Sequence, residues 1–187
     1  MLNINCTFDM EGNINMIIKA EIIVQPKSGH YKERIYDISS QWNSQEWTWV
    51  KFENDDFNEW CGEFRGSPRG VAISKKYKNV LVLTSDYLYQ VNCQSEELNE
   101  YESQSLYQNI TVTPFGDFIV ANDYFMEKIG STLDEKILLD IPAEIDGIKF
   151  NGWTDNLLSI TCEDYSGKHI AMELDSETLE ITIKGFI

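Results

Sequence analysis

Hydrophobic and polar positions follow one another in a similar order in three segments of the chain, which begin at Gly70, Asn109 and Gly147. Each segment reads as a short strand, a tight turn, a strongly apolar second strand, an Asp-Tyr pair, a third strand and a polar turn. The second strands carry apolar side chains on both faces, which predicts that they lie inside a layered β structure. These strands are Val80–Leu83, Phe118–Ala121 and Leu157–Ile160.

An Asp-Tyr pair follows each of these apolar strands and fixes the register of the repeat. The pairs are Asp86-Tyr87, Asp123-Tyr124 and Asp164-Tyr165, at separations of 37 and 41 residues. The turn before each apolar strand contains Gly, Asn, Asp or Pro, which favour tight turns. A period near 40 residues with about four short strands per unit is typical of a β-propeller blade.

The repeat predicts an all-β fold of propeller-like antiparallel units of about 40 residues. An open β-meander or a two-sheet sandwich is the alternative. Residues 17–24 with 33–38, and residues 47–52, are further strand candidates, but their irregular spacing leaves the number of blades open. We expect at most a helical turn or two in the polar segments 95–106 and 131–138. No linker or low-complexity tract divides the chain, which predicts a single all-β domain over residues 1–187.

The charge balance indicates the class of partner. The chain has 31 Asp and Glu residues against 15 Lys and Arg, a formal net charge of −16 at pH 7, and no Lys or Arg between residues 79 and 127. We expect no nucleic-acid binding, because contact with a phosphate backbone requires a basic surface. Such an acidic field attracts a basic protein partner. Acidity that serves only solubility is the alternative interpretation.

Residues 1–20 have neither a basic start nor an unbroken apolar core, so we expect no secretory signal. No apolar run is long enough to span a membrane. The cysteines are widely spaced and form no CxxC pair, which favours free buried thiols in a reducing cytosol over disulfides. They are Cys6, Cys61, Cys93 and Cys162. The sequence thus predicts a soluble, cytoplasmic protein with no membrane association.

Familiar catalytic motifs are absent from the sequence. It contains no GxSxG, HExxH, GxxxxGK[ST] or GxGxxG motif, and the two histidines, His30 and His169, lie outside any motif. The cysteine spacing offers no ligand pair for a zinc site. We therefore expect no enzyme activity, no cofactor and no metal. A hydrolase that uses Asp123 and Asp164 alone is the weakest alternative.

The segment 52–64 interleaves five acidic residues with four aromatic ones and contains no base. Aromatic rings supply large, rigid contact areas, and carboxylates pair with Arg or Lys across an interface. This pattern predicts a partner-binding loop. The candidate contact residues are Asp55, Asp56, Phe57, Glu59, Trp60 and Glu63. The alternative is a polar surface loop in which Phe57 and Trp60 only anchor the chain to the core.

The three Asp-Tyr pairs are a second candidate binding site. In a propeller the loops after the second strand of each blade open on one rim, so Asp86, Asp123 and Asp164 would converge there with their tyrosines. The alternative is that each Asp caps its turn and each Tyr packs inward. For a third aromatic group, Trp42, Trp47 and Trp49, we expect core packing rather than a sugar platform, with Trp47 and Trp49 on one strand face beside the stem of Lys51.

The stretch from Trp49 to Gln90 opens WVKFENDDFNEWCGEFRG and ends TSDYLYQ, and VTPFGD follows at residues 112–117. In these features the chain resembles small acidic immunity proteins of bacterial polymorphic-toxin and contact-dependent growth inhibition systems, over residues 47–187. The resemblance implies a cytosolic inhibitor that binds the C-terminal toxin domain of a secreted effector, often a basic nuclease, and blocks its active site. It carries over no catalytic residues, and it places segment 52–64 at the toxin-facing surface.

Two functional hypotheses follow from the sequence. The first is an immunity protein that neutralises a cognate basic toxin domain by covering its active site with an acidic, aromatic-containing surface. The second is a propeller-like carbohydrate or small-ligand binding module that uses the Asp-Tyr face.

Overall fold

The computed structural model describes residues 15–103 and 105–186. Within these residues, sixteen strands form four four-stranded sheets, and no helix is present. The first sheet contains β1 (Ile17–Ile23), β2 (Lys32–Tyr36), β3 (Trp47–Asn54) and β4 (Glu59–Arg65). The second contains β5 (Pro68–Ser74), β6 (Asn79–Thr84), β7 (Tyr87–Asn92) and β8 (Leu98–Ser103). The third contains β9 (Asn109–Val112), β10 (Phe118–Ala121), β11 (Met126–Ile129) and β12 (Lys136–Leu138). The fourth contains β13 (Ile148–Thr154), β14 (Leu157–Glu163), β15 (His169–Asp175) and β16 (Ile181–Phe186).

The second, third and fourth sheets are antiparallel meanders in which consecutive strands are neighbours. They begin at Pro68, Asn109 and Ile148, which confirms the predicted propeller-like repeat of about 40 residues. The first sheet is built differently. Its strand order is β1-β3-β4-β2, and β2 runs parallel to β4. Strands β8 and β12 occupy the two polar segments for which at most a helical turn or two was expected.

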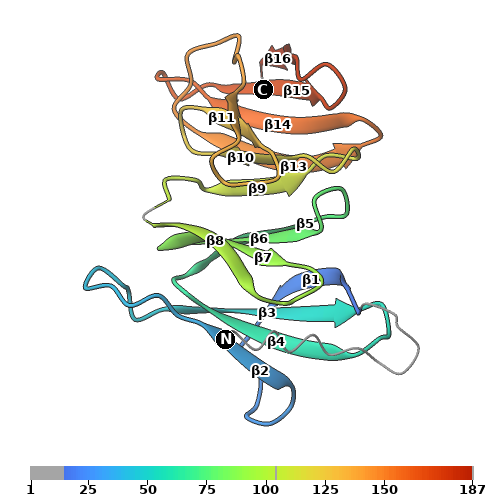
Figure 1. Ribbon diagram of the computed structural model, residues 1–187. Coiled ribbons are helices and arrows are strands. Elements are labelled where there is room, and N and C mark those ends of the chain that lie inside the picture. Colours follow the sequence, from blue (N-terminus) through green and yellow to red (C-terminus); the bar gives the residue numbers. More distant parts are fainter. Residues whose placement is uncertain (1–14, 104, 187) are drawn as a thin grey trace.

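The four sheets stack face to face in chain order, with the first sheet at the bottom of Figure 1 and the fourth at the top. The innermost strands contact one another in the series β1, β5, β9 and β13. A buried apolar cluster fills each of the three spaces between neighbouring sheets. No such cluster joins the first sheet to the fourth within the described residues. Over the described residues, the four sheets therefore form an open stack and not a closed ring.

Burial of the central strands depends on where their sheet lies in the stack. In β6, Val80 and Val82 pack toward the first sheet, and Leu81 and Leu83 pack toward the third. Strand β10 is also buried on both faces. The prediction of two-sided burial is therefore correct for these strands. It is wrong for β14, where alternate side chains, beginning with Leu157, face outward because the fourth sheet has a neighbour on one side only.

The outer face of the first sheet carries charged and amphipathic side chains. Lys51 forms ion pairs with Glu21 at 2.8 Å and with Glu59 at 3.2 Å. The guanidinium of Arg65 lies 3.7 Å from the centre of the Trp47 ring, an arrangement that favours a cation–π contact. Trp47 thus shares a strand face with Lys51 as predicted, but this is the outer face and not the core.

The loops of the stack gather on two opposite rims. The first, called here the Asp-Tyr rim, carries the turns that follow β6, β10 and β14 and lies on the left in Figure 1. The β3–β4 turn lies on the opposite rim, called here the hairpin rim. Hydrogen bonds show this placement. Ile17 pairs with Asn54 at the end of β3 and donates to the Cys93 carbonyl, and Cys93 donates to the Lys78 carbonyl. Lys78 precedes β6 and Cys93 follows β7, so both lie at the ends of these strands that are opposite the β6–β7 turn. The two candidate binding sites are therefore on opposite rims.

Three of the four cysteines, Cys61, Cys93 and Cys162, are free and buried, as predicted. Cys6 lies outside the described residues, as does most of the segment examined for a secretory signal. Within the described part of the chain, no helix has the length and apolar character needed to cross a membrane.

Candidate functional site

The β3–β4 turn on the hairpin rim is short and exposed, and local hydrogen bonds hold it. The Phe57 N–H donates to the Asn54 carbonyl at 2.9 Å, and the Asn54 N–H donates to the Asn58 carbonyl at 3.0 Å. Phe57 has a positive φ of 64°, and its side chain is 79% exposed. This ring is accessible to a partner, so the anchoring alternative does not apply to Phe57.

The carboxylates around Phe57 are engaged within the chain. Asp55 accepts a hydrogen bond from the Met16 N–H at 3.2 Å, and Asp56 accepts one from the Asn58 N–H at 3.0 Å. Glu59 belongs to the ion pairs of Lys51. These contacts compensate part of the negative charge that the sequence assigned to this loop.

Trp60 and Glu63 are not part of the exposed turn. Trp60 is 4% exposed, stacks on Phe52 with 4.3 Å between ring centres and donates to Asn54 Oδ1 at 3.2 Å. Its ring lies in the core, so the core-anchoring alternative applies to it. Glu63 is partly buried in β4, where burial and the nearby charge of Glu33 raise the pKa of its carboxyl. Segment 52–64 is therefore not one continuous recognition surface.

Asp86, Asp123 and Asp164 all lie in turns of the Asp-Tyr rim. Their neighbouring tyrosines differ. Tyr87 is 3% exposed and its hydroxyl donates to Asn43 Oδ1, so the inward-packing alternative applies to this pair. Burial alone would raise the pKa of Asp86, but hydrogen bonds from Ser85 and from Ser44, at 2.7 Å for the latter, hold it below its usual value.

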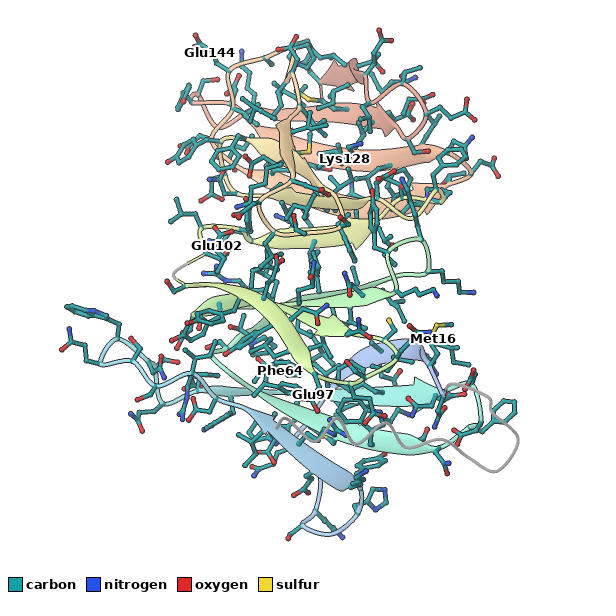
Figure 2. All side chains as sticks on the ribbon, viewed as in Figure 1. Met16, Phe64, Glu97, Glu102, Lys128 and Glu144 are labelled. Carbon is teal, nitrogen blue, oxygen red and sulfur yellow. The ribbon has the colours of Figure 1, made fainter. Side chains whose placement is uncertain are left out.

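In the third and fourth sheets the tyrosines point outward. Tyr124 is 59% exposed and Tyr165 is 67% exposed. The two turns are tied together through the segment that precedes β13. Its Gly147 N–H donates to the Asp123 carbonyl at 2.8 Å, and its Asp146 N–H donates to the Glu163 carbonyl at 2.7 Å. The result is a surface called here the acidic tyrosine patch, which consists of Asp123, Tyr124, Glu144, Asp146, Glu163, Asp164 and Tyr165. Glu144 marks its position at the upper left of Figure 2.

Asp164 shapes this patch by capping its own turn. Its Oδ1 accepts hydrogen bonds from the Ser166 N–H at 2.8 Å and the Lys168 N–H at 3.0 Å. Hydrogen bonds from Ser166 and Lys168 lower the pKa of Asp164, so it is ionised at neutral pH. The capping alternative is correct for Asp164, but Tyr165 does not pack inward.

The charge of the acidic tyrosine patch is largely uncompensated. Within the described residues, none of its carboxylates forms an ion pair with Lys, Arg or His, whereas several acids elsewhere do. The only base in its turns is Lys168. The negative charge of Asp146 and a hydrogen bond to it raise the pKa of Tyr124, so its hydroxyl remains protonated. The Tyr124 hydroxyl is therefore engaged with Asp146, and the patch offers a partner the exposed Tyr165 and several carboxylates that accept hydrogen bonds.

Sequence reasoning missed Glu144, Asp146 and Glu163. The run of acids in residues 140–146 was visible, but only the stacking of the third and fourth sheets brings it beside the Asp-Tyr turns. Trp42 was also assigned incorrectly, since it is 72% exposed beside a pocket on the same rim and not in the core.

No protein-family model matches the sequence, and no curated protein is significantly similar to it. Nineteen chains of solved structures match the fold. One of them is the WD40 domain of SCAP from fission yeast, with a TM-score of 0.41 and 10% sequence identity. That match covers 91% of this chain and 48% of the other, so this chain spans about half the length of its structural neighbour. The propeller-like description above rests on the strand order and the stacking of the sheets themselves.

Proposed function

We propose that this protein is a non-enzymatic binding protein whose cationic protein partner docks on the acidic tyrosine patch. The observation that carries the proposal is the gathering of five carboxylates and two exposed tyrosines from two sheets, with no ion pair to compensate the acids in the described residues. Unpaired surface charge of one sign accelerates encounter with a partner of the opposite sign.

The composition of the patch suits an interface for Arg or Lys side chains. Carboxylates form charge-assisted hydrogen bonds with guanidinium and ammonium groups. Tyrosine supplies a rigid ring for cation–π contact and a hydroxyl for hydrogen bonding. Backbone hydrogen bonds fix the turns that carry these carboxylates before binding, and those to Asp164 Oδ1 also fix its side chain, which lowers the entropy lost on association.

The more specific proposal is that the partner is a toxin domain. It comes from the resemblance to immunity proteins, and the acid excess of the chain supports it. A toxin that acts on nucleic acid carries a basic substrate cleft. An acidic surface that covers this cleft excludes the substrate without any chemistry of its own, and the complex weakens as ionic strength rises.

The experiment compares two charge reversals of equal size on opposite rims. One variant carries Asp123→Lys, Glu144→Lys and Asp146→Lys, and the matched control carries Asp55→Lys, Asp56→Lys and Glu59→Lys. Candidate partners are basic toxin domains taken from adjacent genes. Affinity for each is measured by calorimetry, and folding of the variants by circular dichroism. We expect the patch variant to lose at least about 100-fold in affinity, since each close charge pair contributes about 1.5 kcal/mol or more.

A loss in the control variant with none in the patch variant would move the interface to the hairpin rim. Equal losses in both would mean that only net charge matters, and the patch would then be rejected as a site. Co-expression tests the immunity step separately. If the protein binds the toxin domain but does not restore growth, binding stands and neutralisation is rejected.

A further inference from the structure

A pocket of about 320 Å³ opens on the Asp-Tyr rim between the first and second sheets. Its walls come from the 37–46 connection, the start of β5, the β6–β7 turn, the end of β8 and residues 105–108. Two large apolar side chains beside it are unusually exposed, Trp42 at 72% and Leu106 at 70%. Neither is used in the acidic tyrosine patch, which lies on the third and fourth sheets.

The pocket is formed before any ligand arrives, because hydrogen bonds join its walls. Asp86 of the second sheet accepts the Ser44 N–H of the 37–46 connection at 2.7 Å, and the Tyr87 hydroxyl donates to Asn43 of the same connection. Arg69 donates to the Ser105 carbonyl at 3.2 Å and also to the Tyr107 carbonyl, which holds the opposite wall. Binding sites for small ligands are usually preformed in this way.

The lining is polar but electrically balanced. It contains one acid, Asp86, and one base, Arg69, and both are engaged by neighbouring groups of the chain. The remaining polar side chains are neutral hydroxyls and amides, among them Ser103 and Gln108. Such groups both donate and accept hydrogen bonds. A strongly charged ligand would find no opposite charge in excess, whereas a neutral ligand with many hydroxyls would find matching partners.

We propose that this pocket binds a neutral saccharide. Sugar hydroxyls match the hydroxyl and amide lining, and the exposed Trp42 ring offers a flat apolar surface for the C–H face of a sugar ring. The volume lies at the small end of the range for ligand pockets, roughly 300–1,000 Å³, which indicates a ligand of one or two sugar units. This activity is independent of the cationic partner proposed for the patch.

The full chain is titrated by calorimetry with maltose, cellobiose, lactose and chitobiose, and with glucuronate and glucosamine as charged comparisons. We expect at least one neutral disaccharide to bind saturably in the millimolar range, with little dependence on salt. Trp42→Ala is expected to weaken this binding about tenfold, as the loss of one aromatic contact. Gln108→Ala, at an exposed position of the lining, should weaken it as well.

Phe57→Ala is the matched control, because Phe57 is a similarly exposed aromatic residue on the opposite rim and should leave sugar binding unchanged. Absence of a saturable signal from all four disaccharides overturns the proposal. Tighter binding of a charged sugar, or binding that neither Trp42→Ala nor Gln108→Ala weakens, overturns it too. The charge-reversed patch variant should bind sugar normally, so failure of one proposal is distinguishable from failure of the other.

Discussion

Replacing Phe57 with Asn should stabilise the fold, although it removes a large aromatic side chain. Phe57 holds a left-handed backbone conformation, with φ at 64°. This conformation costs an ordinary L residue about 1–2 kcal/mol, and Asn tolerates it far better. The strain in the turn therefore falls by about 1 kcal/mol when Asn takes the position.

Burial of the Phe57 ring offsets little of this backbone strain, because 79% of the side chain is exposed. Full burial of a Phe side chain contributes about 2.5 kcal/mol, so the buried fifth contributes about 0.5 kcal/mol. The balance for Phe57→Asn is a stabilisation of about 0.5 kcal/mol. Because a urea m-value for a chain of this size is about 2 kcal/mol per molar, the urea midpoint should rise by about 0.25 M.

Leu179 provides the matched control. It has nearly the same backbone, with φ at 61°, but its side chain packs against the core cluster between the third and fourth sheets. Leu179→Asn relieves the same strain, but it removes apolar contacts and places an amide against the core. It should therefore lower stability by about 2 kcal/mol. Both variants are unfolded in urea and followed by tryptophan fluorescence.

A lower urea midpoint for Phe57→Asn would refute the reasoning, since it would show that contacts of the Phe57 ring within the folded chain stabilise it by more than the backbone strain costs. The expected result has a functional meaning. An exposed, strained aromatic residue that folding does not require is available to a partner on the hairpin rim, and the Phe57→Asn variant tests that possibility without destabilising the protein.

Three further predictions follow from burial and charge. Leu81→Ala should lower the free energy of unfolding by about 2–5 kcal/mol, because Leu81 is fully buried between two sheets. Leu157→Ala, on the outer face of the fourth sheet, should change it by less than about 1 kcal/mol. Urea unfolding of the two variants measures the difference. Hydrogen bonds, among them one from Ser85 to Asp86 and one from Lys76 to Asp117, outweigh burial and lower the folded-state pKa values of these two carboxyls below 3.8. Their contribution to stability is complete above that pH and is lost as the pH falls through the folded values. The urea midpoint should therefore drop as the pH is lowered below about 4, and an unchanged midpoint would contradict this prediction. Burial raises the pKa of the Cys93 thiol to about 12, so native protein should not react at Cys93 with iodoacetamide at pH 8 until urea unfolds it, as peptide mass spectrometry would show.

The repeat and the interior strands could be predicted from sequence because their signals are local. Phe118–Ala121 is apolar at every position, and the structure buries it on both faces. In β14 the polar residues Ser159, Thr161 and Glu163 alternate with buried apolar ones, a pattern typical of a strand that is buried on one face only. The four residues Leu157–Ile160 taken alone were too few to show this alternation. Trp60 was misjudged because acids lie near it in sequence, among them Asp56, Glu59 and Glu63, which suggested a surface position. In space the Trp60 ring contacts Phe52 and Asn54.

The candidate site was predicted in part, because the Asp-Tyr turns are periodic and periodicity places them on one rim. The exposure of each tyrosine depends on the connection that passes beside it. The 37–46 connection brings Asn43 to Tyr87 and helps to enclose that ring, whereas Tyr124 and Tyr165 remain exposed. Non-repeated connections of this kind carry no periodic signal, so sequence reasoning found the rim but not the residues that are accessible on it.

The outer faces of the two end sheets carry paired charges. On the first sheet, Lys51 pairs with Glu21 and Glu59. On the fourth sheet, Lys184 pairs with Glu173 at 2.9 Å. Covering these ion pairs with an apolar surface would bury the charges at a large desolvation cost. The pocket between the first and second sheets and the acidic tyrosine patch on the third and fourth sheets lie at different sheet junctions of the same rim, so each can be mutated without changing the residues of the other.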